Sequence, residues 1–160
     1  MILVVLDPEE LQEALELAQQ RNAKPAHTNK KFDAEHGDEE IHYMSALAEV
    51  AWSKQTGWPV DTSVQYGDGG VDFRNNGRTY QIKARDVARY SAPDLLCRKK
   101  YVKADRFILA EVNLQEPDLI RFVGWCTKDE LLLEIKDIRG KGERYIRWRH
   151  DLREIPRELI

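Results

Sequence analysis

The sequence predicts a single α/β domain in which a mixed sheet of about five strands is flanked by helices, with an extra helix at the N-terminus. Two segments, residues 7–22 and 38–55, carry apolar residues at helical spacing. From residue 60 onward, short apolar runs typical of strands alternate with turn-forming residues. A length of 160 residues suits one domain that builds its own core.

The first helix is expected to begin at Asp7, whose carboxylate can accept hydrogen bonds from the first turn. Pro8 suits the first helical position, and Glu10 stands three residues after Asp7, as in a capping box. The helix should end between residues 22 and 25, and the polar stretch 24–32 is interpreted as a connection.

The second helix is expected from about Asp38 to Gln55, where Gly57 and Pro59 end it. Between residues 41 and 53 Glu49 is the only formally charged residue, leaving histidine aside. A carboxylate in such a stretch needs a partner, a metal or an exit to water. Both a helix-edge glutamate that reaches solvent and a functional carboxylate are compatible with this pattern.

The rest of the chain is predicted to be mostly strands. They are expected over residues 60–66, 71–74, 78–84, 106–113 and 119–127. Helices are expected over 94–103 and, after a second capping box at 127–130, to about residue 135. A last strand should contain Tyr145, Ile146 and Trp148, with Ile146 and Trp148 inward and the neighbouring arginines outward.

Asn76-Gly77 favours a two-residue type I′ hairpin turn, and this turn fixes a strand register. Phe73 then faces Tyr80, Asp72 faces Gln81, and Val71 faces Ile82. One face collects apolar residues suited to a core: Val71, Phe73, Tyr80, Ile82 and Ala84. The other face is polar: Asp72, Arg74, Thr79, Gln81 and Lys83. Hydrophobic pattern and turn chemistry favour the same register.

The polar face carries a candidate site. Directly opposed Cβ atoms lie ~5 Å apart, so the oxygens of Asp72 and Gln81 could coordinate one hard divalent cation such as Mg²⁺. The ammonium of Lys83 could orient a water or neutralise charge on a phosphate. Phosphodiester hydrolysis requires these groups. The alternative is an exposed sheet face with an ordinary polar mixture.

Val71-Asp72 followed by Gln81-Ile82-Lys83 resembles the signature of the PD-(D/E)XK nucleases, in which an aspartate ends one strand and an acid-x-lysine triplet lies on the next. The preceding helix with Glu49 resembles the helix that carries a glutamate in many members. The resemblance covers roughly residues 37–127. Residues 1–30, with the N-terminal helix, and a basic C-terminal extension, residues 128–160, lie outside it.

The resemblance implies a restriction-endonuclease-like fold and assigns roles to five residues. Asp72 would be the central metal ligand, and Gln81 would stand where the family usually has a second acid. The backbone carbonyl of Ile82 would complete the metal shell, and Lys83 would act on the water or the scissile phosphate. Glu49 would hold the metal or a second ion, or contact the metal through a water.

This chain departs from the usual pattern at Gln81, because an amide ligand carries no charge and should weaken metal binding unless Glu49 compensates. Some members of the family use this Q-x-K variant. Asp68, in the glycine-rich approach to the strand, is a second candidate for the aspartate role.

Positive charge is concentrated in the second half of the chain, where 18 Lys/Arg face 14 Asp/Glu, against 7 and 14 in the first half. Such asymmetry suits a basic surface for a polyanion, although solvated charge of mixed sign also explains it. The candidate DNA contacts are Arg85, Arg89, Arg98, Lys99, Lys100, Arg147 and Arg149. Tyr145 and Trp148 could stack on bases or pack in the core.

We therefore expect a metal-dependent endonuclease that hydrolyses phosphodiester bonds of duplex or branched DNA, with Mg²⁺ as cofactor and Mn²⁺ able to substitute. A phage or mobile-element setting and a homodimer are compatible with the small size. The alternatives are a catalytically inactive nucleic-acid-binding module that retains the fold and an RNA-processing nuclease. No apolar run reaches the ~20 residues of a membrane span and no signal peptide is seen, so a cytoplasmic location is expected.

Other chemistries lack their motifs. The four histidines show neither HExxH nor zinc-finger spacing, and the glycine-rich stretch 67–70 is too short for a Walker or Rossmann loop. Cys97 and Cys126 are too few for a disulfide framework and are expected to be ordinary buried thiols.

Overall fold

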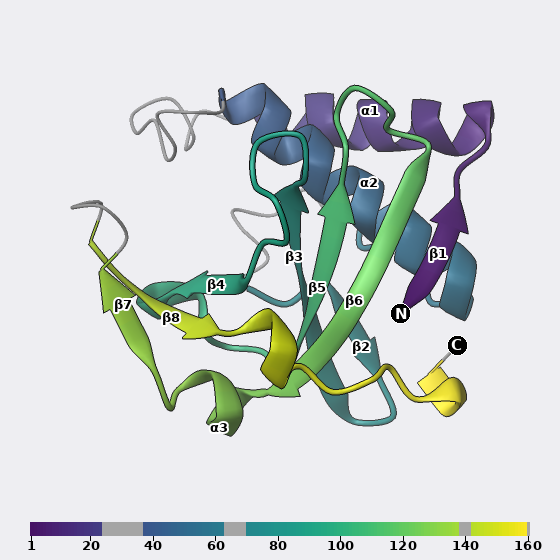
Figure 1. Cartoon of the computed structure of the whole chain (residues 1–160). Helices are drawn as coiled ribbons and strands as arrows, with labels where there is room; N and C mark the ends of the chain where they lie inside the picture. The colour runs from purple at the N-terminus through teal and green to yellow at the C-terminus, as the bar shows by residue number, and fades with distance from the viewer. Residues whose placement is uncertain (24–36, 63–69, 138–141, 160) are drawn as a thin grey trace.

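The computed structural model describes residues 1–23, 37–62, 70–137 and 142–159. Its centre is a curled five-stranded mixed sheet in the order β1-β6-β5-β3-β2 (Figure 1). The strands are β1 (Ile2–Val5), β2 (Phe73–Asn75), β3 (Arg78–Asp86), β5 (Arg106–Val112) and β6 (Leu119–Thr127). Only β3 and β5 pair in parallel; the other neighbours are antiparallel. The expected α/β class with a five-stranded sheet is confirmed.

Helices α1 (Pro8–Asn22) and α2 (Asp38–Thr56) lie together on one face of this sheet (Figure 1). The predicted capping box is present, because the Asp7 carboxylate accepts from the backbone of Glu9 and Glu10 while the Glu10 side chain binds the Asp7 N–H. Helix α2 ends at Gly57, whose φ of 72° is accessible to glycine without strain.

The first hydrophobic core lies between these helices and the sheet. Trp52 of α2 is fully buried and meets the ring of Phe122 edge-on, with centroids 4.9 Å apart. Phe73, Tyr80 and Ile82 extend this core along the hairpin, as predicted. Apolar burial of this kind is the main stabilising term for the domain.

The other face of the sheet is covered by a second, three-stranded sheet rather than by long helices. It contains β4 (Leu95–Arg98), β8 (Glu143–Arg147) and β7 (Ile135–Asp137), in that order, and the one-turn helix α3 (Lys128–Leu131) precedes β7. A second apolar core fills the space between the sheets: Leu95, Cys97, Ala104, Phe107, Leu109, Cys126 and Leu131. Both cysteines are free and buried, as expected.

Several predicted elements differ from the structure. The helix expected over 94–103 is wrong: these residues form β4 and a 3₁₀ turn (Lys99–Tyr101). Leu95 and Cys97 alternate with half-exposed neighbours, so only an extended strand buries both against β5. The helix expected to run to residue 135 ends at Leu131, although its capping box at Thr127 and Glu130 is confirmed.

The ends of the sheet also differ from expectation. Strand β1 was not predicted, and residues 60–62 are not in a strand, while the remainder of the strand expected over 60–66 lies outside the described residues. None of the described helices is both long and apolar enough to cross a lipid bilayer.

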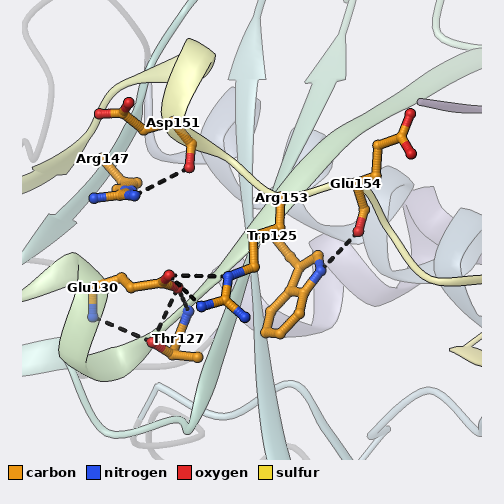
Figure 2. A network of polar contacts seen from close by, with 7 residues as sticks. All are labelled: Trp125, Thr127, Glu130, Arg147, Asp151, Arg153 and Glu154. Atoms are coloured by element: carbon orange, nitrogen blue, oxygen red, sulfur yellow. Dashed lines mark hydrogen bonds and ion pairs between the residues drawn. The ribbon is translucent and has the colours of Figure 1, made fainter.

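The C-terminal segment is fastened to β6 by a polar network (Figure 2). Arg153 pairs through its backbone with Trp125, places its guanidinium over the indole and forms two hydrogen bonds to Glu130. The indole N–H of Trp125 donates to the carbonyl of Glu154 at 2.9 Å. The C-terminal segment packs closely against β6 at Gly124. A Cβ added at this glycine would lie 2.7 Å from the carbonyl oxygen of Arg153.

Candidate functional site

The hairpin that carries the candidate residues has the predicted turn. Asn76 and Gly77 both adopt positive φ, 48° and 72°, as a type I′ turn requires. The register beyond the turn is also as predicted, with Phe73 opposite Tyr80 and Asn75 opposite Arg78.

The predicted register ends at Phe73. The N–H of Asp72 donates to the carbonyl of Tyr80 at 2.8 Å, although Tyr80 is already the partner of Phe73. Two consecutive residues therefore oppose one, which is the arrangement of a β-bulge. The expected pairs Asp72–Gln81 and Val71–Ile82 are wrong, and Val71 packs in the second core instead of beside Phe73.

The bulge brings the Asp72 carboxylate to the edge of β3. Its Oδ2 accepts a 2.6 Å hydrogen bond from the backbone N–H of Ile82, and the side chain is almost fully buried. A strand residue directs its N–H and C=O to the same neighbour, so the Ile82 carbonyl faces the same edge as the carboxylate. Two oxygen donors are therefore directed to the same edge of the strand.

Gln81 and Lys83 lie on the face of β3 that is directed toward the second core. Gln81 is buried and its Oε1 accepts a weak hydrogen bond from Sγ of Cys97, 3.9 Å away. Burial raises the pKa of the Cys97 thiol, the charge of Lys83 lowers it, and the charge of Asp72 raises it. All three predicted hairpin residues therefore lie near this thiol. Within the described chain Lys83 forms no salt bridge.

Two neighbours of this cluster were not predicted as site residues. Cys97 was missed because its segment was expected to be helical. Gly70 has φ of 86°, and a Cβ there would lie 2.5 Å from the carbonyl oxygen of Tyr101 and 3.3 Å from Nε2 of Gln81. The backbone at Gly70 thus packs directly against the Gln81 amide, where no other residue fits without displacement.

Glu49 is placed on α2, on the opposite side of the five-stranded sheet from Gln81 and Lys83. Glu49 is 4% exposed, and its carboxylate forms a two-pronged ion pair with Arg21 of α1, at 2.8 and 2.7 Å. The charged partner explains how a carboxylate remains in this apolar stretch. Asp68, the second candidate for the aspartate role, lies outside the described residues.

The donor set at the hairpin is compatible with a magnesium-type ion. Asp72 supplies a carboxylate and Ile82 a carbonyl, and Mg²⁺ commonly binds through one or two carboxylates while keeping several waters. Gln81 could add an amide oxygen. In the described ranges no three His, Cys, Asp or Glu side chains form a metal-binding group, so such a site would depend on this smaller set.

The predicted DNA-contacting cations near the C-terminus are mostly engaged inside the protein. Arg149 binds the buried Glu111, which also pairs with Arg121 at 3.1 Å. Arg147 donates to the carbonyl of Asp151, and its Nε is buried (Figure 2). Ile146 is buried, as expected, but the expectation that both arginines point outward is wrong, because Arg147 shares its strand face with the buried Leu95 and Arg149 binds the buried Glu111.

The other predicted cations differ in exposure and contacts. Arg89 approaches Glu40 and Asp86, and Lys99 binds Glu143. Arg85 and Lys100 lie over the rings of Tyr90 and Tyr101, respectively. Arg98 is on β4, where it has Arg144 of β8 as its direct partner.

No protein-family model matches this chain, and a comparison with curated proteins finds no significant match.

Proposed function

We propose that this protein is a metal-dependent DNA endonuclease of the PD-(D/E)XK kind with a restriction-endonuclease-like fold. The observation that supports it best is the Asp72 carboxylate, held at the β3 edge by the backbone N–H of Ile82, with Lys83 one position further along the same strand. The hairpin thus supplies an acidic oxygen, a neutral oxygen and a cation within one short segment.

In this proposal Asp72 and the Ile82 carbonyl hold the ion, with the Gln81 amide as a third donor. A bound Mg²⁺ or Mn²⁺ would supply a Lewis acid and lower the pKa of a bound water. Asp72 is oriented by its hydrogen bond to Ile82, so its second oxygen has a fixed direction. Preorganised ligands of this kind reduce the reorganisation needed at the moment of reaction.

Lys83 is the group that acts on the phosphate. Its ammonium forms no salt bridge with any described carboxylate, so its charge is not neutralised by an ion pair. A cation beside a phosphodiester stabilises the negative charge that develops on its oxygens during attack by water. Gln81 and Lys83 lie on the same side of β3 because side chains alternate along a strand, and Gln81 accepts a weak hydrogen bond from the buried Cys97 thiol on that side.

The second candidate function is a catalytically silent nucleic-acid-binding module, or an RNA-processing enzyme with the same site. The neutral Gln81 and the engagement of Glu49 by Arg21 favour the silent module, because both reduce the negative charge available to a metal. Such a module would bind DNA equally well with and without metal and would be indifferent to loss of Lys83.

The proposal includes a homodimer, because one site cuts one strand and double-strand cutting commonly uses a two-fold axis. It also includes a cytoplasmic phage or mobile-element setting. Light scattering of the purified protein, alone and with duplex DNA, tests the homodimer. A monomer in both conditions would limit the enzyme to single-strand cuts or to successive cuts.

The deciding experiment compares cleavage of plasmid, branched DNA and RNA by the wild type, Asp72→Asn and Lys83→Met, each with Mg²⁺, Mn²⁺ or EDTA. Asp118→Asn and Lys103→Met change the same charges at exposed positions outside the proposed site and serve as matched controls. We expect metal-dependent DNA cutting that both site variants lose and both controls retain. Absence of cutting with every substrate and metal would leave the binding module, and cutting of RNA alone would reassign the substrate.

A further inference from the structure

Strand β1 is an edge of the five-stranded sheet, at the right of Figure 1, and no described strand pairs with its outer side. The N–H of Leu6 donates to the carbonyl of Asp118 at 2.7 Å. This bond fixes which residues of the β1–β6 pair are hydrogen-bonded to each other, because such pairs alternate along antiparallel strands. Val4 therefore directs its backbone groups to β6, whereas Leu3 and Val5 direct theirs to the open edge.

Within the described chain, one end of this edge is protected by a charged side chain. The ammonium of Lys54, which also pairs with Glu10, donates to the carbonyl of Val5 at 3.0 Å. The N–H and carbonyl of Leu3 and the N–H of Val5 have no hydrogen-bond partner among the described residues. Proteins commonly protect an exposed edge with charges or proline, because open edges pair with other chains. Residues 1–6 contain neither.

The side chains along this edge are apolar and exposed. Val4 points into the first core, so Leu3 and Val5 point to the opposite face of the sheet. The exposed fractions are 62% for Met1, 57% for Leu3, 59% for Val5 and 41% for Leu119, the register partner of Val5. These four residues, called the β1 patch below, expose on the order of 400 Å², and an apolar patch of this size often marks an interaction site.

The β1 patch is complementary to itself under a two-fold axis. When two β1 strands pair antiparallel around Leu3, Leu3 of each copy exchanges both backbone hydrogen bonds with Leu3 of the other. Val5 of each copy then lies opposite Met1 of the other, and its N–H can donate to the Met1 carbonyl. These side chains share one face and form a continuous apolar row flanked by Leu119. Centring the pair on Val5 would instead place Leu3 opposite the polar Asp7.

The charged side chains beside the β1 patch are compatible with this pairing. Lys54 and Arg121 border the patch, and each pairs with a carboxylate of its own copy, Glu10 and Glu111 respectively. In the paired sheet the two Arg121 residues are three strand spacings apart, about 14 Å, which exceeds the screening length at physiological salt. An apolar centre with a polar border is the usual arrangement of a protein interface.

We propose that β1 is a homodimer interface, in which a second copy of this chain pairs antiparallel with it around Leu3. The inference goes beyond the proposed endonuclease, because it rests on the open edge and the β1 patch and does not depend on cleavage. Two patches and the paired backbones bury about 1,000 Å² in total, at the lower limit of specific interfaces. The dimer should therefore be reversible, with a Kd of roughly 10–100 µM.

The first test is sedimentation equilibrium of the wild type, Leu3→Lys and Leu133→Lys, from about 1 to 300 µM, a range that brackets the expected Kd. Leu133 is a matched control, because it is 77% exposed and lies between α3 and β7, outside the β1 patch. Leu3→Lys should weaken dimerisation at least tenfold, because two ammonium groups would face each other at the two-fold axis. Leu133→Lys should behave as the wild type. Thermal melting checks folding, and lysine is well tolerated on edge strands.

The second test fixes the register by oxidative crosslinking of Leu3→Cys and Val5→Cys. Both natural cysteines are buried, so the introduced thiol is the accessible one. Cα atoms of a directly opposed, hydrogen-bonded pair lie ~5.5 Å apart, which suits a disulfide. Leu3→Cys should therefore crosslink two copies. Val5→Cys should not, because the two Val5 residues would be offset by four positions, about 13 Å along the strands.

Three results would overturn the β1 interface: a wild type that stays monomeric at the highest concentration, a dimer that Leu3→Lys leaves unchanged, or equal crosslinking of both cysteine variants. Association beyond the dimer would also overturn it, because a two-fold pairing closes. Plasmid cleavage by the wild type is measured separately. A β1-dependent dimer without cleavage of any substrate would refute the nuclease and leave the interface, and metal-dependent cleavage by a monomer would do the reverse.

Discussion

Oδ2 of Asp72 lies 2.6 Å from the backbone nitrogen of Ile82, so a carboxylate takes the place of a strand carbonyl at the end of the β2–β3 hairpin. The bond satisfies a backbone donor beside a buried strand and fixes the side chain on which the proposed chemistry depends. Structural and catalytic roles of Asp72 can therefore be separated by substitution.

Asp72→Ala should lower the free energy of unfolding by about 1–3 kcal/mol, because the Ile82 N–H is left without its acceptor. Asp72→Asn retains an accepting oxygen and should cost less, yet both variants should lose at least about a hundredfold in cleavage rate. Urea unfolding and plasmid nicking measure the two effects. An alanine variant as stable as the wild type would show that the bond is not formed in solution.

Gln81→Glu should restore the second acid of the proposed metal site. An added ligand charge strengthens binding of hard cations, so half-maximal cleavage should need roughly tenfold less Mg²⁺. Gln81→Met, which is similar in size and offers no oxygen donor, should need more Mg²⁺ than the wild type. The measurement is the cleavage rate as a function of Mg²⁺ concentration for the wild type and the two variants. Identical curves for all three proteins would show that Gln81 does not bind the metal.

Gly70→Ala should reduce both stability and cleavage, because its Cβ would overlap the Tyr101 carbonyl and press on the Gln81 amide. Gly57→Ala is the matched control: Gly57 also has positive φ, but a Cβ there meets nothing within 4 Å. Backbone strain should lower the free energy of unfolding by about 1 kcal/mol in both variants. The overlap should lower it by a further ~1–3 kcal/mol in Gly70→Ala. Equal losses of stability, with cleavage intact in both, would contradict the close packing at Gly70.

Whether Glu49 is a metal ligand can be tested by comparing a substitution of Glu49 with a substitution of Arg21, its ion-pair partner. Arg21→Met removes a two-pronged ion pair from the buried Glu49 carboxylate. We expect it to lower the free energy of unfolding by about 3 kcal/mol or less, below the usual range for a fully buried pair because Arg21 is 23% exposed. If Glu49 also supports the metal, Glu49→Gln should raise the Mg²⁺ requirement, and Arg21→Met should not. A purely structural pair would lower the stability of both variants and leave the metal titration of both unchanged.

Glu130 makes stability depend on pH. Its burial favours the neutral form, but hydrogen bonds from the Thr127 backbone and from Arg153 outweigh this, and the pKa is lowered from its usual value of 4.5. The stabilisation provided by ionised Glu130 is therefore fully present above the pKa that Glu130 has in the unfolded chain. It is lost as the pH falls through the lower pKa of Glu130 in the folded protein. Glu130→Gln should flatten the acid limb of stability, whereas Asp129→Asn, at an exposed neighbour, should follow the wild type in urea unfolding at neutral and acid pH.

Local signals predicted the elements that depend on neighbours in sequence. Both capping boxes and the Asn76-Gly77 turn are set by side chains within a few residues, and β3, β5 and β6 show long apolar patterns. The bulge at Asp72 was not predictable from alternation, because it depends on a bond between a side chain and the backbone of the neighbouring strand.

The segments that were misread are those decided by distant contacts. Residues 94–103 have no strong period of their own, and their conformation follows from burial of Leu95 and Cys97 between the two sheets. Arg149 is oriented by Glu111 of β5, and Arg147 lies opposite Leu95 of β4. Alternation gives two faces of a strand, but it does not say which face another sheet will cover.

The position of β1 has a consequence for the order in which the chain folds. Among the described strands, β1 (Ile2–Val5) pairs with β6 alone, and the residues of β6 lie more than a hundred positions later in the sequence. Loop closure over such a separation is slow, and non-local pairing of this kind lowers folding rates. The strand that comes first in the sequence should therefore be among the last to dock, after the hairpin and the parallel pair have provided an edge to receive it.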